Sequence, residues 1–228
     1  MNLYIVRHGN PNYDNDCLTP LGHEQAEAAA EALEAIGIDE IYSSPMGRAR
    51  ETAKHLADRI GKPIAIEPWA HEVEAYAKSA DGRPVQLVSI GGDLLRSPEI
   101  IAMGDDWPKH PRFDGEASVR DVINEVEGGM TDFMRRQGYV LEGERFRALD
   151  PAHPNEKNIA LFCHAGVFLV ITSYLLQIPQ RVAWNALFMY TCGYTWCNIV
   201  TNPEGYGTAR YYCVNNTSHI TAKGLPLT

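Results

Sequence analysis

The stretch from Leu3 to Gly9 reads LYIVRHG, and a second stretch from Ile159 to Gly166 reads IALFCHAG. In each, a histidine follows a run of apolar residues, with Arg7 between them in the first stretch, and a glycine comes shortly after. Short apolar runs of this kind are typical of buried strands, and the glycine marks a turn. We therefore predict two short strands, each with a histidine at its carboxyl end.

A helix is predicted downstream of the first strand. Thr19-Pro20 supplies an N-cap and a proline for the first helical turn, and apolar residues then recur at helical spacing until Gly37. The next predicted elements are a strand at Ile38–Ser43, a helix opened by Ser44-Pro45 that ends near Gly61, and a strand at Pro63–Glu67. Because strands and helices alternate, we predict an α/β fold, a three-layer sandwich whose central sheet is mostly parallel and flanked by helices.

The pattern changes after this third strand. Glycines, prolines and mixed charges interrupt it over residues 75–113, so we predict a cap-like insertion there, within a single domain that spans residues 1–228. The chain then returns to regular elements, which are a helix at Val119–Met134, a hairpin at Tyr139–Leu149 and two β-rich runs at Tyr194–Thr201 and Ala209–Val214. We expect the insertion and the hairpin to cover the substrate site and to carry specificity. The basic residues of the insertion are predicted to be solvated surface charges: Lys78, Arg83, Arg96, Lys109 and Arg112.

The composition limits the partners of this chain. Its 228 residues include 20 Lys+Arg against 29 Asp+Glu, and the resulting net charge of −9 argues against nucleic acid and anionic membranes as partners. No basic, apolar leader precedes the first strand, and polar residues interrupt the longest apolar stretch, Ala160–Leu176, so we expect a cytoplasmic protein without a membrane span. Five scattered cysteines without a CxxC pair predict neither a disulfide framework nor a cysteine-rich zinc site.

Two arginines and two histidines fall where a parallel sheet binds its ligands. Arg7 and His8 end one predicted strand, His164 ends another, and Arg48 lies at the beginning of a predicted helix. Ligands of open α/β sheets bind outside the carboxyl ends of the strands. A guanidinium group offers a planar fork to phosphate oxygens, and the free N–H groups at a helix start add positive potential. The sequence therefore predicts a small positive pocket for a phosphate monoester.

Six stretches in chain order form a recognisable set. They are Leu3–Gly9 (LYIVRHG), Leu18–Ala26 (LTPLGHEQA), Ile41–Ala53 (IYSSPMGRARETA), the region of Glu72, Asp114–Ser118 (DGEAS) and Leu161–Val167 (LFCHAGV). In these stretches the chain resembles the histidine phosphatase superfamily, in the branch that includes the cofactor-dependent phosphoglycerate mutases. The resemblance implies a phosphomonoester phosphatase that acts on a small phosphorylated substrate.

The resemblance also implies a role for each residue of the predicted pocket. His8 is the implied nucleophile, phosphorylated on a ring nitrogen, while Arg7, Arg48 and His164 hold the phosphoryl group. The neighbouring arginines favour the neutral form that His8 needs for attack. Its other ring nitrogen is expected to donate to a carbonyl or a similar acceptor, which fixes the tautomer. No metal is implied, and a cofactor, 2,3-bisphosphoglycerate, is implied only if the protein is a mutase.

Two positions match the family pattern less closely. Glu72 occupies the place of the carboxylic acid that protonates the leaving group, but the sequence reads HEVEAY there and Glu74 is a competitor. The loop after Gly9 reads NPNYD, where many mutases have a different sequence. In this loop Asn10 is a candidate substrate ligand, and Asp14 is a candidate for ordering the loop, although turn chemistry accounts for both.

Three alternatives stay open from the sequence. A cofactor-dependent phosphoglycerate mutase would use the same residues, although the departure in the loop after Gly9 favours a phosphatase. Cys163 could be a nucleophile in a cysteine-based phosphatase loop, but that loop needs an arginine six residues later, where Leu169 stands. A non-catalytic interaction module on the same fold would be expected to lack one of the core residues, and none is missing.

Overall fold

The centre of the protein is an eight-stranded mixed sheet. A computed structural model describes residues 1–79, 82–89, 92–113 and 119–228. In spatial order the strands are β5 (Ile64–Ile66), β4 (Glu40–Ser43), β10 (Asn158–Cys163), β1 (Asn2–Arg7), β11 (Tyr194–Thr201), β12 (Tyr206–Asn216), β9 (Arg145–Ala148) and β8 (Tyr139–Glu142). The first four pair in parallel, and every later pairing from β1–β11 onward is antiparallel. The predicted α/β class is confirmed, but the sheet is mixed and not mostly parallel, because the half that contains β1 and β10 is parallel and the half from β11 to β8 is antiparallel.

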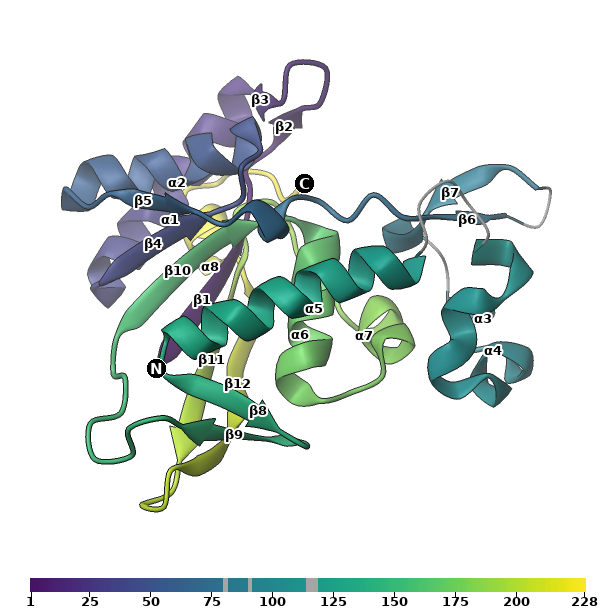
Figure 1. Ribbon diagram of the computed structural model, residues 1–228. Helices are drawn as coiled ribbons and strands as arrows, with labels where there is room; N and C mark the ends of the chain where they lie inside the picture. Colours follow the sequence, from purple (N-terminus) through teal and green to yellow (C-terminus); the bar gives the residue numbers. More distant parts are fainter. Residues whose placement is uncertain (80–81, 90–91, 114–118) are drawn as a thin grey trace.

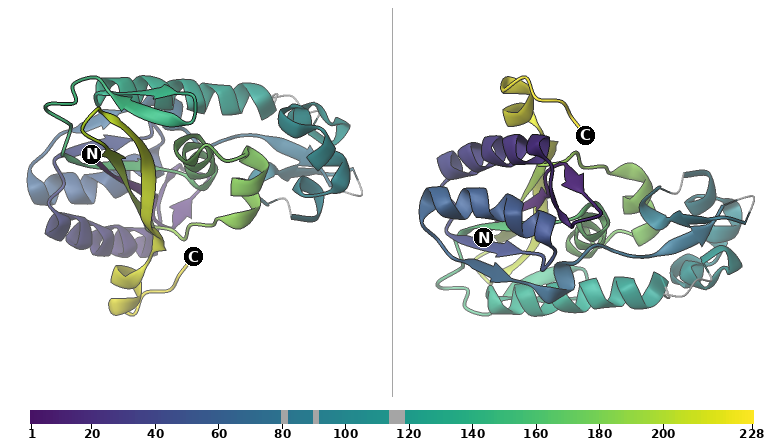
Figure 2. Two further views of the ribbon diagram at one scale, coloured as in Figure 1. Left: turned by 90° about the horizontal axis from the view of Figure 1, so that it is seen from below. Right: turned by 90° about the horizontal axis from the view of Figure 1, so that it is seen from above.

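Helices cover both faces of this sheet, as Figures 1 and 2 show. On one face lie α1 (Pro20–Ile36), α2 (Gly47–Ile60) and the short α8 (Ser218–Ala222), and on the other α5 (Val119–Arg136), α6 (Ala165–Leu176) and α7 (Gln180–Ala186). Alternate residues of β1 enter different cores. Leu3 and Ile5 pack in the cluster that contains α5 and α6, while Tyr4 and Val6 pack in the cluster that contains α1 and α2. Both faces of the strand are therefore buried, as expected for a parallel strand in a three-layer fold.

The first helix follows the sequence prediction closely. Thr19 is its N-cap, with the side-chain oxygen accepting from the backbone N–H of Gly22 at 3.1 Å. Gly37 ends the helix in the left-handed region, with φ of 81°, where a residue without Cβ pays little steric cost. Residues at the two ends of α1 therefore determine where this helix begins and ends.

The second helix begins later than the sequence predicts. We expected Ser44-Pro45 to open it, but α2 starts at Gly47, after Met46. The hydroxyl of Ser44 accepts from the backbone N–H of Met46 at 3.2 Å, and the N–H of Gly47 donates to the Asp16 carboxylate at 2.6 Å. A carboxylate from a distant loop caps this helix, so the local pattern misplaced its start.

The predicted insertion consists of short elements. They are β6 (Tyr76–Lys78), β7 (Pro84–Gln86), α3 (Gly92–Leu95), α4 (Pro98–Ala102) and 3-10 turns at Leu87–Ser89, Gly104–Lys109 and Pro111–Phe113. They form a lobe beyond α7, on the right of Figure 1. Trp107 and Phe113 pack edge to face in it with ring centroids 5.0 Å apart, and both are buried. Two further short elements lie near the sheet, a ribbon of β2 (Pro11–Asn12) and β3 (Cys17–Leu18), and a 3-10 turn at Pro68–Ala70.

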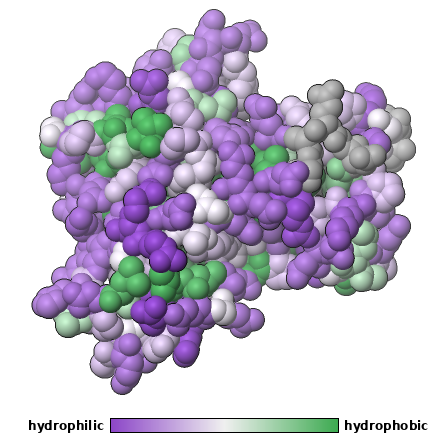
Figure 3. Space-filling view, in the orientation of Figure 1, coloured by the Kyte–Doolittle hydropathy of each residue, from purple (hydrophilic) through white to green (hydrophobic). Residues whose placement is uncertain are grey.

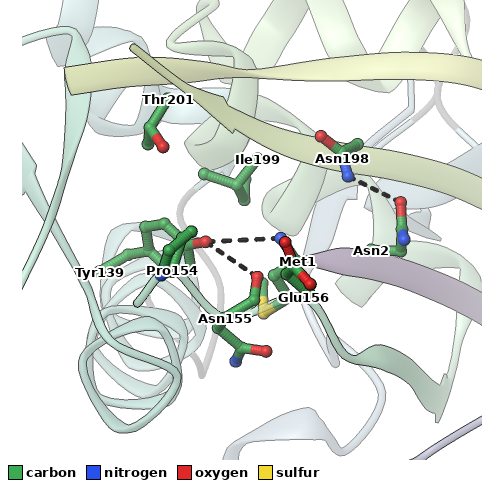
Figure 4. Close-up of a pocket in the computed structure, with 9 residues that line it drawn as sticks. All are labelled: Met1, Asn2, Tyr139, Pro154, Asn155, Glu156, Asn198, Ile199 and Thr201. Carbon is green, nitrogen blue, oxygen red and sulfur yellow. Dashed lines mark hydrogen bonds between the residues drawn. The ribbon is translucent and has the colours of Figure 1, made fainter. Parts of the chain in front are cut away.

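The predicted hairpin is present as β8 and β9, but it does not cover the site. It joins the sheet at the antiparallel edge, where β9 pairs with β12. The ring hydroxyl of Tyr139 accepts from the amino group of Met1 at 3.4 Å and donates to the carbonyl of Asn155 at 3.2 Å, as drawn in Figure 4. The hairpin therefore lies at the amino end of β1, the end opposite Arg7.

The surface agrees with the acidic composition. Figure 3 shows a mainly hydrophilic face with apolar patches that are separate from one another. Among the residues that the structure describes, no helix combines the length and apolar character needed to cross a membrane.

Candidate active site

The register of two parallel strands brings the predicted histidines together. Arg7 of β1 is paired with Cys163 of β10, and each strand is followed at once by a histidine. The backbone N–H of His8 donates to the carbonyl of Cys163 at 3.0 Å. The rings of His8 and His164 consequently lie side by side, with centroids 5.1 Å apart. The sheet itself places both imidazoles at its carboxyl edge, as the sequence predicts.

His8 is buried and held in one tautomer. Its Nδ1 lies 2.8 Å from the carbonyl oxygen of Gly9, which can only accept. A neutral ring must therefore carry its proton on Nδ1, leaving the lone pair on Nε2. Burial, reinforced by the charge of Arg7, lowers the pKa of His8 to about 3, so that the ring is neutral at physiological pH. The predicted backbone acceptor is thus the carbonyl of Gly9.

Close packing explains the glycine that follows His8. A Cβ at Gly9 would lie 2.6 Å from the carbonyl oxygen of Gly22 in α1. The N–H of Gly9 donates to the hydroxyl of Thr52 in α2 at 2.9 Å. The turn after β1 therefore packs closely between α1 and α2. A larger residue at position 9 would displace the turn, and with it His8.

His164 is buried as the residue before α6. Its Nε2 lies 2.8 Å from the hydroxyl oxygen of Ser44, which already accepts from the N–H of Met46. The hydroxyl of Ser44 can donate its hydrogen to His164 Nε2, and in that arrangement the ring proton of His164 lies on Nδ1. Burial and the proximity of His8 hold the pKa of His164 well below its usual value, so it too is neutral.

Two guanidinium groups face the histidines. Arg7 donates from Nη1 to the carbonyl of Met189 at 2.5 Å, and Arg48 donates from Nη1 to the carboxylate of Asp16 at 2.5 Å. Asp16 also accepts the N–H of Gly47, so one carboxylate orients both the arginine and the start of α2. Burial would raise the pKa of Asp16, but the hydrogen bonds from Gly47 and Arg48 outweigh it and lower the pKa.

Asp16 is a residue of the candidate site that sequence reasoning missed. Asp14 was the candidate for ordering this loop, but Asp14 is exposed and Asp16 makes the contacts. The signal for Asp16 is weak in the sequence, because nothing in its local pattern links this turn residue to Arg48 in α2.

Several buried donors at this edge have no protein partner. Across residues 1–79, 82–89, 92–113 and 119–228, four buried side-chain nitrogens lack a hydrogen bond. Three of them belong to the site, namely Arg7 Nε, Arg48 Nε and His164 Nδ1. Unpaired buried donors are costly, so a cluster of them indicates a place where an anion is bound.

Glu72 approaches the same edge from the segment after the Pro68–Ala70 turn. Its Oε1 accepts from the N–H of Val73 at 2.8 Å and from the N–H of Gly166 in the first turn of α6 at 3.0 Å. Burial raises the pKa of Glu72, and the hydrogen bond from Val73 and the charge of Arg48 offset this only in part. A raised pKa is what a carboxyl group needs to donate a proton near neutral pH.

Most of the chain matches a known family. Residues 3–206 match the model of the histidine phosphatase superfamily, branch 1. The chain belongs to the histidine phosphatase superfamily. The predicted family and the predicted phosphatase-type enzyme are thereby confirmed.

Relatives of this histidine phosphatase carry more than one activity in their names. The putative phosphoserine phosphatase 2 of Hydrogenobacter thermophilus is 36% identical over 193 residues, which cover 80% of this chain and 82% of that protein. A probable phosphoglycerate mutase of Enterobacter sp. is 31% identical over 183 residues, covering 76% and 77%. A solved phosphoserine phosphatase of Entamoeba histolytica in complex with phosphoserine shares the fold, with a TM-score of 0.65 at 18% identity, covering 96% and 98%.

The pocket of this histidine phosphatase opens from the phosphoryl site toward the insertion. It has a volume of about 610 Å³, and its lining includes Arg7, Arg48, Asp16 and Glu72 of the site together with Tyr76, Gln86, Val88 and Ser89 of the insertion. Glu74 also lines it and is exposed. The insertion therefore forms part of the wall, as expected, whereas the hairpin β8–β9 contributes no lining residue.

Asn10 lies beside the site, and its side chain is hydrogen-bonded to two threonines. Its side-chain oxygen accepts from the hydroxyl of Thr19 at 2.7 Å, and its Nδ2 donates to the hydroxyl of Thr228 at 3.2 Å. Asn10 is absent from the lining of the pocket, as are the buried His8 and His164. The DGEAS stretch at residues 114–118, which contributed to the resemblance, lies outside the described residues.

Cys163 is unsuited to be a nucleophile. Its side chain is fully buried in the core that contains α5 and α6. Burial, reinforced by the nearby Glu72, raises the pKa of the thiol far above its usual value. A thiol that stays protonated and out of contact with the pocket cannot attack a bound phosphate.

Proposed function

We propose that this histidine phosphatase hydrolyses a small phosphomonoester and carries the phosphoryl group on His8 between two half-reactions. The observation that carries this proposal is the cluster of unpaired buried donors on Arg7, Arg48 and His164 beside a neutral imidazole. Such donors suit the charged oxygens of a phosphoryl group, and the imidazole supplies a nucleophile next to them.

In the first half-reaction, His8 Nε2 attacks phosphorus. The P–N bond forms as the ester P–O bond breaks, and the proton of the Glu72 carboxyl group passes to the departing oxygen. Arg7, Arg48 and His164 hold the phosphoryl oxygens, so their charge is stabilised throughout the transfer. The carbonyl of Gly9 accepts from Nδ1 of His8 and stabilises the ring as it becomes positively charged.

In the second half-reaction, water attacks the phosphohistidine. The Glu72 carboxylate takes a proton from the water as the new P–O bond forms. The P–N bond breaks, inorganic phosphate leaves, and His8 regains the lone pair on Nε2. Glu72 ends the cycle protonated, as it began. In this scheme Glu72 is preferred to Glu74, because it is fixed by the N–H groups of Val73 and Gly166.

The remaining expectations complete the proposal. We infer that Asn10 holds the loop after β1 through Thr19 and does not contact substrate, since its side chain is engaged there. We propose a metal-independent reaction in which the two guanidinium groups supply the positive charge. A cytoplasmic location, a single domain and the absence of nucleic-acid and membrane partners stay predictions, and the net charge of −9 supports the last of them.

The proposal is tested by phosphate release from a panel of phosphomonoesters in the presence of EDTA. We expect the His8→Ala variant to lose more than about 10⁵-fold in kcat/KM, since loss of the nucleophile removes the covalent route altogether. His153→Ala, which alters an exposed histidine paired with Asp150, is the matched control and should keep wild-type activity. Retained hydrolysis in His8→Ala would contradict the proposal.

Two further assays on the same proteins separate the alternatives. A ³²P-labelled substrate should label the wild-type chain transiently and leave His8→Ala unlabelled. A folded protein with no turnover and no label would favour the non-catalytic interaction module. Isomerisation of 3-phosphoglycerate that depends on added 2,3-bisphosphoglycerate would favour the mutase, which the similarity to a probable phosphoglycerate mutase keeps in consideration.

A further inference from the structure

Beyond the phosphoryl site, polar and apolar side chains share the lining of the pocket. The polar ones include Glu74, Gln86 and Ser89, and the apolar ones include Val73, Val88, Phe168, Leu169, Leu187, Phe188 and Met189. Four of them are buried against the core, namely Val73, Phe168, Leu169 and Met189. Phe188 is 59% exposed and its ring packs against Tyr190 with centroids 5.0 Å apart. The wall thus has a fixed inner part and an accessible outer part.

This apolar wall begins directly beside the acid. A Cβ at Gly166 would lie 2.7 Å from Glu72 Oε1, 2.9 Å from Val73 Cβ and 3.2 Å from Val88 Cγ1. The carboxyl group and these two valines therefore meet over the first turn of α6. The oxygen that receives the proton of Glu72 belongs to the leaving group, so the carbon chain attached to it must pass along this wall.

The positive charges of the pocket already have roles in the proposed phosphoryl transfer. Among the described residues that line it, the cations are Arg7 and Arg48, and Arg48 is paired with Asp16. Both arginines are assigned to the phosphoryl oxygens. Glu74 adds an exposed carboxyl group on the leaving-group side. A carboxylate on the leaving group would find no free cation and would meet Glu74.

The basic residues of the insertion add no positive charge to the lining of the pocket. Lys78, Arg83, Arg96, Lys109 and Arg112 are all absent from the lining. Lys109 pairs with Asp106 at 2.7 Å, and Arg112 donates to the carbonyl of Lys78 at 2.8 Å. The residues outside the described part of the chain include no lysine, arginine or histidine.

We propose that the substrate of this enzyme is a phosphate ester of an apolar, uncharged alcohol, and that Glu74 disfavours leaving groups that carry a carboxylate. The inference rests on the proposed phosphatase function and names the substrate class of the same site. It sets this chain apart from relatives named for phosphoserine and phosphoglycerate, whose leaving groups carry a carboxylate.

The test compares esters whose leaving groups are all primary or secondary alcohols, so that leaving-group reactivity differs little. Benzyl phosphate is the apolar probe, glycerol 1-phosphate the polar uncharged probe, and 3-phosphoglycerate the carboxylate probe. We expect kcat/KM for benzyl phosphate to exceed that for 3-phosphoglycerate by at least about tenfold, with glycerol 1-phosphate between them.

Two pairs of variants locate the effect. Phe188→Ala should raise KM for benzyl phosphate about fivefold and change that for 3-phosphoglycerate less than about twofold, because it removes apolar contact area alone. Tyr212→Ala is its control, since Tyr212 is 55% exposed on β12, outside the pocket.

Glu74→Lys should raise the ratio of 3-phosphoglycerate to benzyl phosphate hydrolysis about tenfold. Its control is Glu144→Lys, which makes the same change of charge on the exposed turn of the distant hairpin.

The possible outcomes separate the two proposals. If 3-phosphoglycerate is hydrolysed as well as benzyl phosphate, the leaving-group inference is wrong and the phosphatase stands. An equal response to Glu74→Lys and Glu144→Lys would remove Glu74 from the inference, because the effect would then come from net charge. If no ester is hydrolysed and His8 takes no label, the proposed function fails, and the substrate class fails with it.

Discussion

The two ends of one pocket are built in different ways. The phosphoryl end takes its residues from the ends of long elements, β1, β10, α2 and α6, whose strands are paired in a fixed register. The leaving-group end includes residues from the insertion, where strands have three residues and helices four or five. We therefore propose that the sheet positions the groups that perform the chemistry, while specificity depends on the insertion together with α6 and the segment after α7.

The difference has a physical cause. At the phosphoryl end, buried charges and a close approach of Gly9 to Gly22 leave few residue types that fit. At the other end, hydrocarbon side chains such as Val88 form a surface that other residues of similar volume could also form. A change at the first end should abolish the reaction, and a change at the second should alter which ester reacts.

The largest difference in kcat/KM between the two regions is expected when one arginine from each is replaced by alanine. Arg48→Ala should lower kcat/KM about 10³–10⁵-fold, the range found when an arginine that stabilises a transferring phosphoryl group is lost. Arg112→Ala removes a guanidinium of the insertion that donates to the carbonyl of Lys78 and does not line the pocket. It should leave kcat/KM for the same ester within about twofold. Steady-state hydrolysis of benzyl phosphate measures both.

A comparable loss in the two arginine variants would contradict the division between the regions. It would mean that the insertion takes part in phosphoryl transfer. Circular dichroism of both variants should match the wild type, because Arg48 contributes to the site through Asp16 and not to an apolar core.

The next effect concerns the acid and its pH dependence. Burial raises the pKa of Glu72 above its ordinary value, and burial lowers that of His8 to about 3. The reactive enzyme has His8 neutral and Glu72 protonated, so kcat/KM should be lost only near pH 3 on the acid side. On the alkaline side it should fall as pH rises through the raised pKa of Glu72.

Glu72→Gln should lower kcat/KM about 10²–10⁴-fold and remove the alkaline fall that Glu72 causes, because the amide does not titrate. Glu74→Gln is the matched control, and it should keep the alkaline fall with much less loss of activity. The profile of kcat/KM for each variant from pH 4 to 9 gives the answer. If the fall disappears in Glu74→Gln and persists in Glu72→Gln, the roles of the two carboxyl groups are reversed.

Much of the phosphoryl end could be predicted from sequence because strand ends carry it. The apolar runs before His8 and His164 indicate buried strands, and parallel pairing alone brings their carboxyl ends together. The placement of Arg48 near a helix start was also right, although α2 begins at Gly47. These residues follow from patterns within a few positions of themselves.

The features that could not be predicted depend on contacts between distant segments. Asp16 orients Arg48 across 32 positions of chain, and Ser44 contacts His164 across 120. The hairpin β8–β9 was recognised, but its place at the edge beside β12 depends on the order of the whole sheet. No local pattern contains that order, so the hairpin was wrongly expected to cover the site.

The smallest expected effect tests how tightly the two ends meet over α6. A Cβ at Gly166 would lie 2.7 Å from Glu72 Oε1 and 2.9 Å from Val73 Cβ, so Gly166→Ala must displace the acid or the wall. We expect kcat/KM to fall about tenfold to a hundredfold, as for a misplacement of about 1 Å. Gly128→Ala in α5 is the control, since a Cβ there meets nothing within 4 Å. It should keep full activity and raise the free energy of unfolding by about 0.5–1 kcal/mol, because alanine is the better helix former. Equal activity in the two variants would show that Glu72 can shift without loss, and the acid would then be less closely positioned than its hydrogen bonds to Val73 and Gly166 imply.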